Sequence, residues 1–333
     1  MGWKKVVNLQ LLCCTLLFPP ELFLLFRSER IKMKKLIIIA IASILPLLVS
    51  AQSVVTLPLW DNAHAPSGNG VTLLQTDKGV YWENVTSAVM TVYRPEHPNG
   101  LAVLACPGGS YLQIWEREFH NIAKWYNEQG ILLAVLRYRI PNGHKEVPMD
   151  DLNKAMKTLR EHQSEYGFTK LGVHGNSAGG HLASTAATHY TSPDLRPDFQ
   201  ILFYPVISMD SLICHKPSRD NLLGQNPSAE DIAFYSNERH VTKDTPPAFI
   251  ATSGTDLHVS VNNSIAYYKA LLEHGVPACL HIYPSGGHGW FNKSDFNYRN
   301  MALEELKLWL QGFVKNEQNS SKNGGEKEKR KTV

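Results

Sequence analysis

The stretch that decides the fold is residues 171–183, Leu-Gly-Val-His-Gly-Asn-Ser-Ala-Gly-Gly-His-Leu-Ala. Its first four residues are typical of a buried strand, and the end of the stretch opens a helix rich in small side chains. Between them Gly175-Asn176-Ser177-Ala178-Gly179 matches G-x-S-x-G, a weak signal alone. In a strand, turn and helix context, the pattern predicts a sharp turn that exposes the hydroxyl of Ser177. Glycine on either side allows the close backbone approach that this turn needs.

Short apolar segments alternate with helical periodicity along most of the chain, which predicts an α/β fold with a mainly parallel sheet and helices on both faces. Apolar residues recur every three or four positions in the expected helices. These helices are 151–166, 263–274 and 301–313. The expected strands are short and rich in aliphatic residues. They are 88–93, 101–105, 132–137, 170–174, 200–204, 248–252 and 279–283.

Residues 209–246 interrupt this alternation. The segment is rich in proline and has only a short helical signal around 229–235. Long ordered insertions in compact domains are usually functional, so the segment is interpreted as a small cap over the active site. A plain surface excursion is the alternative.

The N-terminal region is typical of a targeting segment. Met33-Lys34-Lys35 followed by an apolar run predicts a signal peptide over 33–51, with cleavage before Gln52. Residues 1–32 are interpreted as an upstream extension from a misassigned start. A membrane anchor is the alternative, but Pro19, Pro20 and Glu21 interrupt its apolar stretch. The protein is therefore expected to be exported, periplasmic or secreted, with no stable membrane span after cleavage.

The remaining chain is expected to hold one catalytic domain, 52–317, and a disordered tail, 318–333, rich in Ser, Asn, Gly and Lys. Residues 1–51 contain seven Lys and Arg and two Glu, so without them the formal charge changes from +3 to −2. A nucleic-acid partner is not expected from this balance. Three cysteines remain, Cys106, Cys214 and Cys279, and they form neither a disulfide framework nor a CxxC metal motif.

A serine hydroxyl needs a positioned base, and fourteen histidines are available. His288 is the best candidate because Gly286-Gly287-His288-Gly289 is a loop just past the last expected strand. His181 is nearer in sequence, but it lies one helical turn inward and is interpreted as a packing residue. A carboxylate that orients the histidine is expected between the serine and the histidine. Asp256 fits best because it follows the strand 248–252, and Asp210 is the alternative.

A tetrahedral intermediate also needs N–H donors for its oxyanion. Cys106-Pro107-Gly108-Gly109-Ser110-Tyr111 forms a glycine turn directly after the strand 101–105. Gly109, Ser110 and Ala178 are the candidate oxyanion donors. The candidate substrate-binding residues are aromatic side chains near these motifs, which can stack on sugar rings but more often serve as packing residues. They are Tyr111, Trp115 and Trp290.

Together these motifs resemble those of the acetyl xylan esterase and feruloyl esterase-like α/β hydrolases of polysaccharide-degrading bacteria. The resemblance covers about 101–310 and includes two further segments, Ser218-Arg219-Asp220-Asn221-Leu222-Leu223-Gly224 and Thr245-Pro246-Pro247. It implies an α/β-hydrolase fold and ester hydrolysis through an acyl-enzyme, with Ser177, Asp256 and His288 as the triad and no metal or organic cofactor. Two departures concern substrate choice. Family members often have an aspartate pair followed by Val-Pro in the acid loop, where this chain has Asp256-Leu257-His258-Val259-Ser260, and Ser110 stands where a third glycine is common.

The sequence thus favours an exported serine esterase that removes acetyl or related acyl groups from polysaccharides such as acetylated xylan. A serine peptidase of prolyl oligopeptidase type would keep the triad, but residues 52–333 leave no room for the large gating domain of such peptidases. The sequence is also compatible with a general carboxylesterase or lipase and with a non-catalytic binding protein, because fold and triad do not fix the acyl group. The oligomeric state does not follow from the sequence.

Overall fold

The computed structural model describes residues 54–61 and 65–329. All of these described residues belong to one compact unit. The predicted upstream extension, 1–32, and the predicted signal peptide, 33–51, lie outside the described residues and stay predictions. Within the described ranges, no helix is both long enough and apolar enough to cross a membrane.

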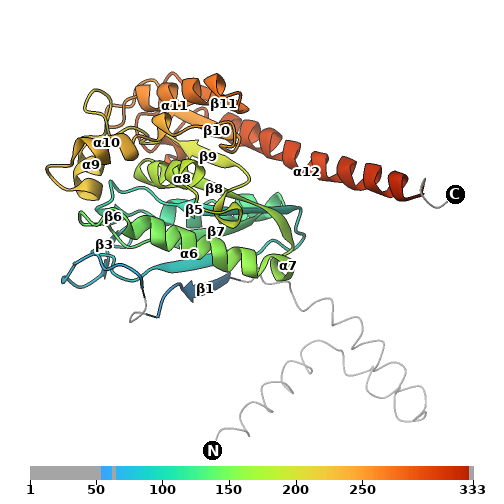
Figure 1. Cartoon of the computed structure of the whole chain (residues 1–333), viewed down its shortest axis with the longest axis horizontal. Coiled ribbons are helices and arrows are strands. Elements are labelled where there is room, and N and C mark those ends of the chain that lie inside the picture. Colours follow the sequence, from blue (N-terminus) through green and yellow to red (C-terminus); the bar gives the residue numbers. More distant parts are fainter. Residues whose placement is uncertain (1–53, 62–64, 330–333) are drawn as a thin grey trace, which may run out of the picture. The chain divides into compact units, whose positions relative to one another are not determined.

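An eight-stranded sheet forms the centre of this unit, in the order β1-β4-β7-β5-β8-β9-β10-β11 (Figure 1). The strand pairs β1–β4 and β4–β7 are antiparallel, and the other pairs are parallel. The strands are β1 Val54–Pro58, β4 Val89–Tyr93, β5 Gly100–Cys106, β7 Leu132–Arg137, β8 Phe168–Asn176, β9 Gln200–Phe203, β10 Ala248–Ser253 and β11 Ala278–Tyr283. All seven predicted strands are confirmed, whereas β1 was not predicted.

Two apolar layers cover the sheet, one on each face. In β5 the side chains alternate: Ala102 and Leu104 pack in one layer, and Val103 and Ala105 in the other. Burial on both faces explains why the strands are almost continuously apolar. The first layer contains residues of the helices α6 Val147–Glu161, α8 Ala178–Thr188 and α11 Asn262–Glu273. The second contains residues of α4 Arg117–His120, α5 Ala123–Glu128 and α12 Arg299–Lys329.

The helices have the following bounds: α4 Arg117–His120, α5 Ala123–Glu128, α6 Val147–Glu161, α7 Gln163–Tyr166, α8 Ala178–Thr188, α9 Lys216–Leu223, α10 Ala229–Phe234, α11 Asn262–Glu273 and α12 Arg299–Lys329. Single 3₁₀ turns form at η3 Pro193–Leu195, η4 Asn237–Arg239 and η5 Trp290–Asn292. The helix expected over 151–166 begins four residues earlier and is divided into α6 and α7.

Helix α12 differs from the prediction of a disordered tail over 318–333, because it continues to Lys329. Extending an existing helix costs much less than nucleating one. The segment also contains several Glu and Lys, which are good helix formers, and these offset its glycines. The composition therefore predicted the polarity of this segment correctly, but the predicted disorder is wrong up to Lys329.

Residues 209–246, which we call the insertion, lie between β9 and β10 and contain α9, α10 and η4. Their interpretation as a cap over the active site stays a prediction. The short helix expected around 229–235 is α10. Helix α9 was not predicted, because only a short helical signal around 229–235 was found in this proline-rich segment. Pro217 lies in the first turn of α9, where its missing N–H has no helical partner to lose.

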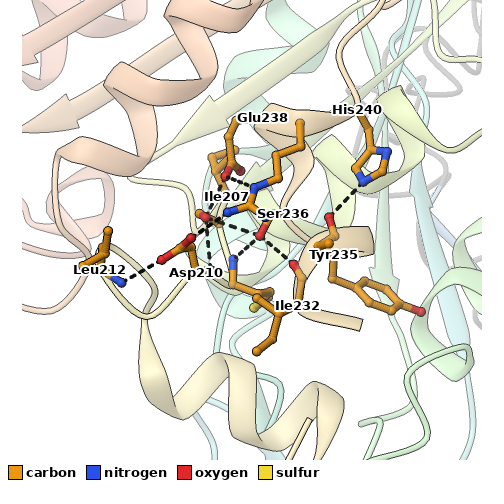
Figure 2. A network of polar contacts seen from close by, with 12 residues as sticks. Ile207, Asp210, Leu212, Ile232, Tyr235, Ser236, Glu238 and His240 are labelled. Atoms are coloured by element: carbon orange, nitrogen blue, oxygen red, sulfur yellow. Dashed lines mark hydrogen bonds and ion pairs between the residues drawn. The ribbon is translucent and has the colours of Figure 1, made fainter. Parts of the chain in front are cut away.

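A polar network ties the two ends of the insertion together (Figure 2). The Ser208 hydroxyl donates to Glu238 at 2.8 Å, and the backbone N–H of Met209 donates to the Ser236 hydroxyl at 3.1 Å. Arg239 pairs with Asp210 at 2.6 Å. Ser208 directly precedes the insertion, Met209 and Asp210 begin it, and the other three residues lie near its end. The insertion is therefore closed at its base.

A second, three-stranded sheet lies beside the glycine turn after β5. It consists of β2 Thr76–Asp77, β3 Trp82–Glu83 and β6 Gln113–Ile114. Strand β6 begins directly after the turn and one intervening residue, so this small sheet fixes the far end of the turn.

Candidate active site

Ser177 lies on the sharp turn between β8 and α8, as the sequence predicted. Its backbone has φ 53° and ψ −121°, which is a strained conformation for a residue with a side chain. Glycine is required around it: a Cβ at Gly175 would lie 2.1 Å from the carbonyl oxygen of Gly179, and one at Gly179 would lie 1.9 Å from that of Cys106. The turn therefore raises the serine above the sheet only because both flanking positions lack side chains.

His288 and Asp256 complete a relay with Ser177. The Nε2 atom of His288 lies 2.9 Å from the Ser177 hydroxyl oxygen, and its Nδ1 atom lies 2.7 Å from the Asp256 carboxylate. The glycine loop after β11 carries the histidine, and the loop after β10 carries the aspartate. All three predicted residues are thus brought together at the carboxyl ends of their strands. The distances fit proton transfer from the serine to an oriented imidazole.

The Asp256 side chain is fully buried, yet its surroundings favour the carboxylate. Burial alone would raise its pKa, but the hydrogen bond and charge of His288, with the backbone N–H groups of Val259 and His258, hold the pKa below its usual value. These N–H groups donate to the other carboxylate oxygen at 3.0 and 2.9 Å. Asp210, the alternative acid, instead pairs with Arg239 at the base of the insertion.

The oxyanion role of Gly109, Ser110 and Ala178 stays a prediction, and the hydrogen bonding of their N–H groups is compatible with it. Among the described residues, the N–H groups of Gly109, Ser110 and Ala178 donate to no acceptor. Trp115 N–H donates to the carbonyl oxygen of Gly108 at 3.1 Å, and Gln113 N–H to that of Gly109 at 2.9 Å. The N–H and C=O of one trans peptide point in opposite directions, so these bonds also orient the N–H groups of Gly109 and Ser110.

The same reasoning applies to Ala178. The carbonyl oxygen of Ser177 accepts from Gly180 at 2.9 Å and from Val206 at 3.0 Å, which fixes the peptide that carries the Ala178 N–H. This N–H also opens helix α8, where the positive end of the helix dipole favours an anion. Backbone donors therefore exist on both sides of the serine. A side chain at Gly108 would lie 3.1 Å from the Ser177 Cβ, which shows how close the two turns are.

Two of the three predicted substrate contacts are wrong. Tyr111 is 1% exposed, and its hydroxyl is hydrogen-bonded to Nδ1 of His181 at 2.8 Å. Trp290 is fully buried and packs against Phe203 and Phe296. Aromatic residues beside a motif point into the core as readily as outward, and the sequence does not distinguish the two.

Trp115, the third candidate, is half-buried and stays a prediction. Its ring stacks on that of Tyr81, with the centroids 5.0 Å apart and 27° between the planes. The indole also lies beside the glycine turn, since a Cβ at Gly109 would approach its Cδ1 to 3.0 Å. The two rings thus form an aromatic pair next to the candidate oxyanion donors.

His181 is buried, as its packing interpretation predicted, but it also bridges two segments. Its Nε2 lies 2.8 Å from the carbonyl oxygen of Tyr235, which requires a proton on Nε2, so its Nδ1 accepts from Tyr111. Burial lowers the pKa of His181 to about 4. The imidazole is therefore neutral at physiological pH.

Sequence reasoning missed two residues that lie close to the triad. The ring of Tyr204 lies edge-on to that of His288, with the centroids 4.9 Å apart, and supports the imidazole from one side. Glu118 is half-buried and accepts a hydrogen bond from Asn176 at 2.9 Å, and desolvation of its carboxyl group raises its pKa. Glu118 is near the glycine turn in sequence, but no motif marked it. Within the described part of the chain, no cluster of three His, Cys, Asp or Glu side chains could hold a metal ion.

Comparisons with known proteins agree with this geometry. The profile of the α/β-hydrolase fold family matches residues 120–292. The crystal structure of an acetyl ester-xyloside bifunctional hydrolase from Caldicellulosiruptor lactoaceticus is 31% identical, with a TM-score of 0.66 over 80% of this chain and 98% of that one. The chain belongs to the α/β-hydrolase fold family. The resemblance inferred from the sequence motifs is confirmed at this level.

Among curated proteins, this α/β hydrolase is 38% identical over 234 residues to an acetylxylan esterase of Xylanibacter ruminicola. It is also 33% identical over 205 residues to an endo-1,4-beta-xylanase B of Butyrivibrio fibrisolvens. The matches cover 68% and 56% of this chain, but 48% and 32% of the two relatives. The chain therefore spans about half the length, or less, of the curated relatives it matches.

Proposed function

We propose that this α/β hydrolase is a serine esterase that removes acyl groups, foremost acetyl, from plant polysaccharides such as acetylated xylan or from their oligosaccharides. The observation that carries the proposal is the continuous relay from Asp256 through His288 to Ser177, at 2.7 and 2.9 Å. Free backbone donors lie beside the serine. This combination is what acyl transfer to serine requires.

The chemistry proceeds in two steps. Ser177 Oγ attacks the ester carbonyl carbon while His288 Nε2 takes the hydroxyl proton, and Asp256 stabilises the resulting imidazolium. The N–H groups of Gly109, Ser110 and Ala178 bind the negative oxygen of the tetrahedral intermediate. His288 then gives the proton to the departing sugar oxygen. The sugar leaves as an alcohol, and an acyl-serine remains. Water then attacks this second ester while His288 takes one of its protons. His288 passes that proton to Ser177 Oγ as the bond between the acyl carbon and the serine oxygen breaks, which releases the carboxylic acid and restores the free serine.

The substrate part of the proposal has two supports. The relatives with identities of 31% and 38% are described as an acetyl ester-xyloside hydrolase and an acetylxylan esterase. The pair of Tyr81 and Trp115 offers an apolar ring surface beside the candidate oxyanion donors, and sugar rings stack on such surfaces through their C–H faces. We propose that this pair contacts a sugar unit of the acylated chain.

We also propose that the mature protein begins at Gln52 and acts outside the cytoplasm. The basic and apolar pattern of 33–51 supports this. N-terminal sequencing of the protein recovered from the periplasm or culture medium tests it. A protein that keeps residues 33–51 and stays in the cytoplasm would contradict the proposal.

The function is tested by measuring acetate released from acetylated xylan by the protein that begins at Gln52. Hydrolysis of a simple aryl acetate and the variant Ser177→Ala are measured in parallel. We expect release that disappears in Ser177→Ala. Turnover of the aryl acetate without release from xylan would contradict the substrate and keep the serine mechanism. No turnover of either ester, with retained binding of the polysaccharide, would favour a binding protein instead.

A further inference from the structure

The glycine turn after β5 contains an unusual pair of residues. Ser110 and Tyr111 both have positive φ angles, 56° and 59°, although neither is glycine. Such a conformation persists in a residue with a side chain only when its surroundings hold it there. Ser110 is also one of the candidate oxyanion donors. What holds this pair therefore decides where the donor N–H groups point.

The first tether comes from the insertion. The side-chain amide of Asn221, in helix α9, donates to the carbonyl oxygen of Ser110 at 2.9 Å, across 111 residues of sequence. The backbone carbonyl of Asn221 in turn accepts from Gly143 N–H at 3.0 Å, which fixes Asn221 itself. Because the Ser110 carbonyl belongs to the peptide that directly follows the donor N–H, this bond limits the rotation of the donor residue.

The second tether starts at Tyr111 and also ends in the insertion. The Tyr111 hydroxyl donates to Nδ1 of His181, and Nε2 of His181 donates to the carbonyl oxygen of Tyr235, at 2.8 Å in both bonds. Tyr111 and His181 are buried, so neither bond is exchanged for one with solvent at low cost. Tyr235 ends α10. The nucleophile helix α8, which carries His181, is thereby linked to both the turn and the insertion.

The insertion is a firm support for these tethers. Its base is closed by the polar network of Ser208, Asp210, Ser236 and their partners (Figure 2). Lys145 of the main domain also forms an ion pair with Asp231 in α10. The insertion thus contacts the domain at several points, and its two tethers reach consecutive residues of the turn.

We infer that Asn221 is a positioning residue for the oxyanion donors, and that the insertion acts through Asn221 and through the Tyr111–His181–Tyr235 bridge to hold the turn in its strained conformation. This inference rests on the proposed ester hydrolysis. It gives Asn221, which lies in the segment Ser218–Gly224 that the sequence marked, a function in transition-state stabilisation. Asn221 acts through Ser110 and is not itself a member of the triad.

The test compares kcat and KM for an aryl acetate with the inhibition constant of a trifluoromethyl ketone. Ser177 adds to the ketone carbon, its proton passes to His288, and the negative oxygen of the adduct is held by the donor N–H groups, so the ketone reports on the oxyanion site. For Asn221→Ala we expect kcat to fall about 10- to 100-fold, below the full loss of an oxyanion donor. The ketone inhibition constant should rise by a similar factor, with KM changed less than about threefold.

Three further variants separate positioning from folding. Asn221→Asp keeps the shape of the side chain but lacks the N–H donor. Its losses of kcat and of ketone affinity should therefore be at least as large as those of Asn221→Ala. Tyr111→Phe removes one hydroxyl of the second tether and should shift kcat and the inhibition constant in the same direction. Asp220→Asn alters the neighbouring residue of α9, whose partners are Lys216 and Arg219, and should leave both values unchanged.

Unchanged kcat and ketone inhibition in Asn221→Ala would overturn the inference. A loss of kcat that is fully explained by a smaller fraction of folded protein would also overturn the inference. Thermal melting and titration of Ser177 with a phosphonate measure that fraction. A wild-type protein that neither hydrolyses the ester nor binds the ketone would overturn the proposed function, and with it this inference.

Discussion

Two pairs of residues in this molecule are each separated by 111 positions and hydrogen-bonded across the active site. Ser177 meets His288 on the triad side, and Ser110 meets Asn221 on the oxyanion side. The first pair was predicted from the sequence, and the second was not. A serine nucleophile demands a base, and few residue types can serve, whereas many side chains can donate to a carbonyl oxygen.

The comparison teaches that the two sides are built differently. Loops that end three parallel strands supply the triad side, and each of its residues contacts the next directly. The oxyanion side uses backbone N–H groups, so its precision depends on what holds the backbone, including an insertion far away in sequence. Changes to the triad should therefore abolish chemistry, and changes to the tethers should weaken it.

The largest effect is expected on the triad side. Ser177→Ala removes the nucleophile, and kcat for an aryl acetate should fall by about 10⁴-fold or more. The backbone strain at this position is already present with serine, so the fold should be retained. Steady-state kinetics and circular dichroism check this. A variant that kept more than about a hundredth of the activity would mean that another residue attacks the ester.

Asp256→Asn should follow closely, with a loss of about 10³- to 10⁴-fold in kcat. The amide oxygen can still accept from His258 and Val259, but the amide cannot stabilise the imidazolium of His288. Asp210→Asn is the matched control, because Asp210 was the alternative acid and pairs with Arg239 instead. Equal losses in the two variants would contradict the assignment of Asp256.

Lowering the pH should lower the free energy of unfolding through His181, which lies in the tether of the oxyanion side. Burial lowers the pKa of His181 to about 4, whereas the ordinary value is 6.5. Between about pH 6.5 and 4 the unfolded chain binds a proton that the folded protein does not, so the free energy of unfolding falls as the pH falls. The contribution of this one group is at most about 1.4 kcal/mol per pH unit.

Denaturant unfolding of the wild type and of His181→Gln at about pH 7, 6 and 5 measures this slope. At neutral pH the free energy of unfolding should be lower in the variant than in the wild type. It should also fall less steeply as the pH is lowered, by the slope that corresponds to about one bound proton. The same replacement at the exposed His97 is the control. A slope that is identical in the wild type and His181→Gln would contradict the assignment of His181 as a neutral bridge.

A smaller effect is expected at the aromatic pair of Tyr81 and Trp115, which belongs to neither the triad side nor the oxyanion side. Tyr81→Ala removes the ring that stacks on Trp115 without touching the glycine turn, so KM for acetylated xylan should rise about three- to tenfold. Hydrolysis of the aryl acetate should be unchanged. Acetate release at several polysaccharide concentrations checks this, and parallel losses on both substrates would contradict a sugar contact.

The smallest effect on catalysis is expected at Trp290, which the sequence suggested as a substrate contact. Trp290 is fully buried, and within the described part of the chain its indole N–H has no hydrogen-bond partner. Trp290→Phe should therefore leave KM for both substrates unchanged and act only on stability, by about 1 to 2 kcal/mol through lost volume. A changed KM for xylan with unchanged stability would restore the original prediction.

The sequence predicted the sheet well because its strands are buried on both faces and therefore almost continuously apolar. It missed β1, whose residues are largely exposed, and α9, which lies in a proline-rich segment and has Pro217 in its first turn. In the site, the sequence identified Ser177, Asp256 and His288, whose catalytic roles only a few residue types can fill. It could not find Asn221, Tyr204 or Glu118, whose roles depend on where the chain brings them. It also misplaced Tyr111 and Trp290, because side-chain direction within a loop does not follow from the sequence.

The most direct test of the account is to label the protein with a fluorophosphonate and identify the modified peptide by mass spectrometry, with esterase activity measured in the same samples. We predict a single modification on Ser177 that appears as activity disappears, much slower labelling in His288→Ala, and no labelling of Ser177→Ala. Modification of another residue, or full activity after complete labelling of Ser177, would contradict the proposed serine mechanism.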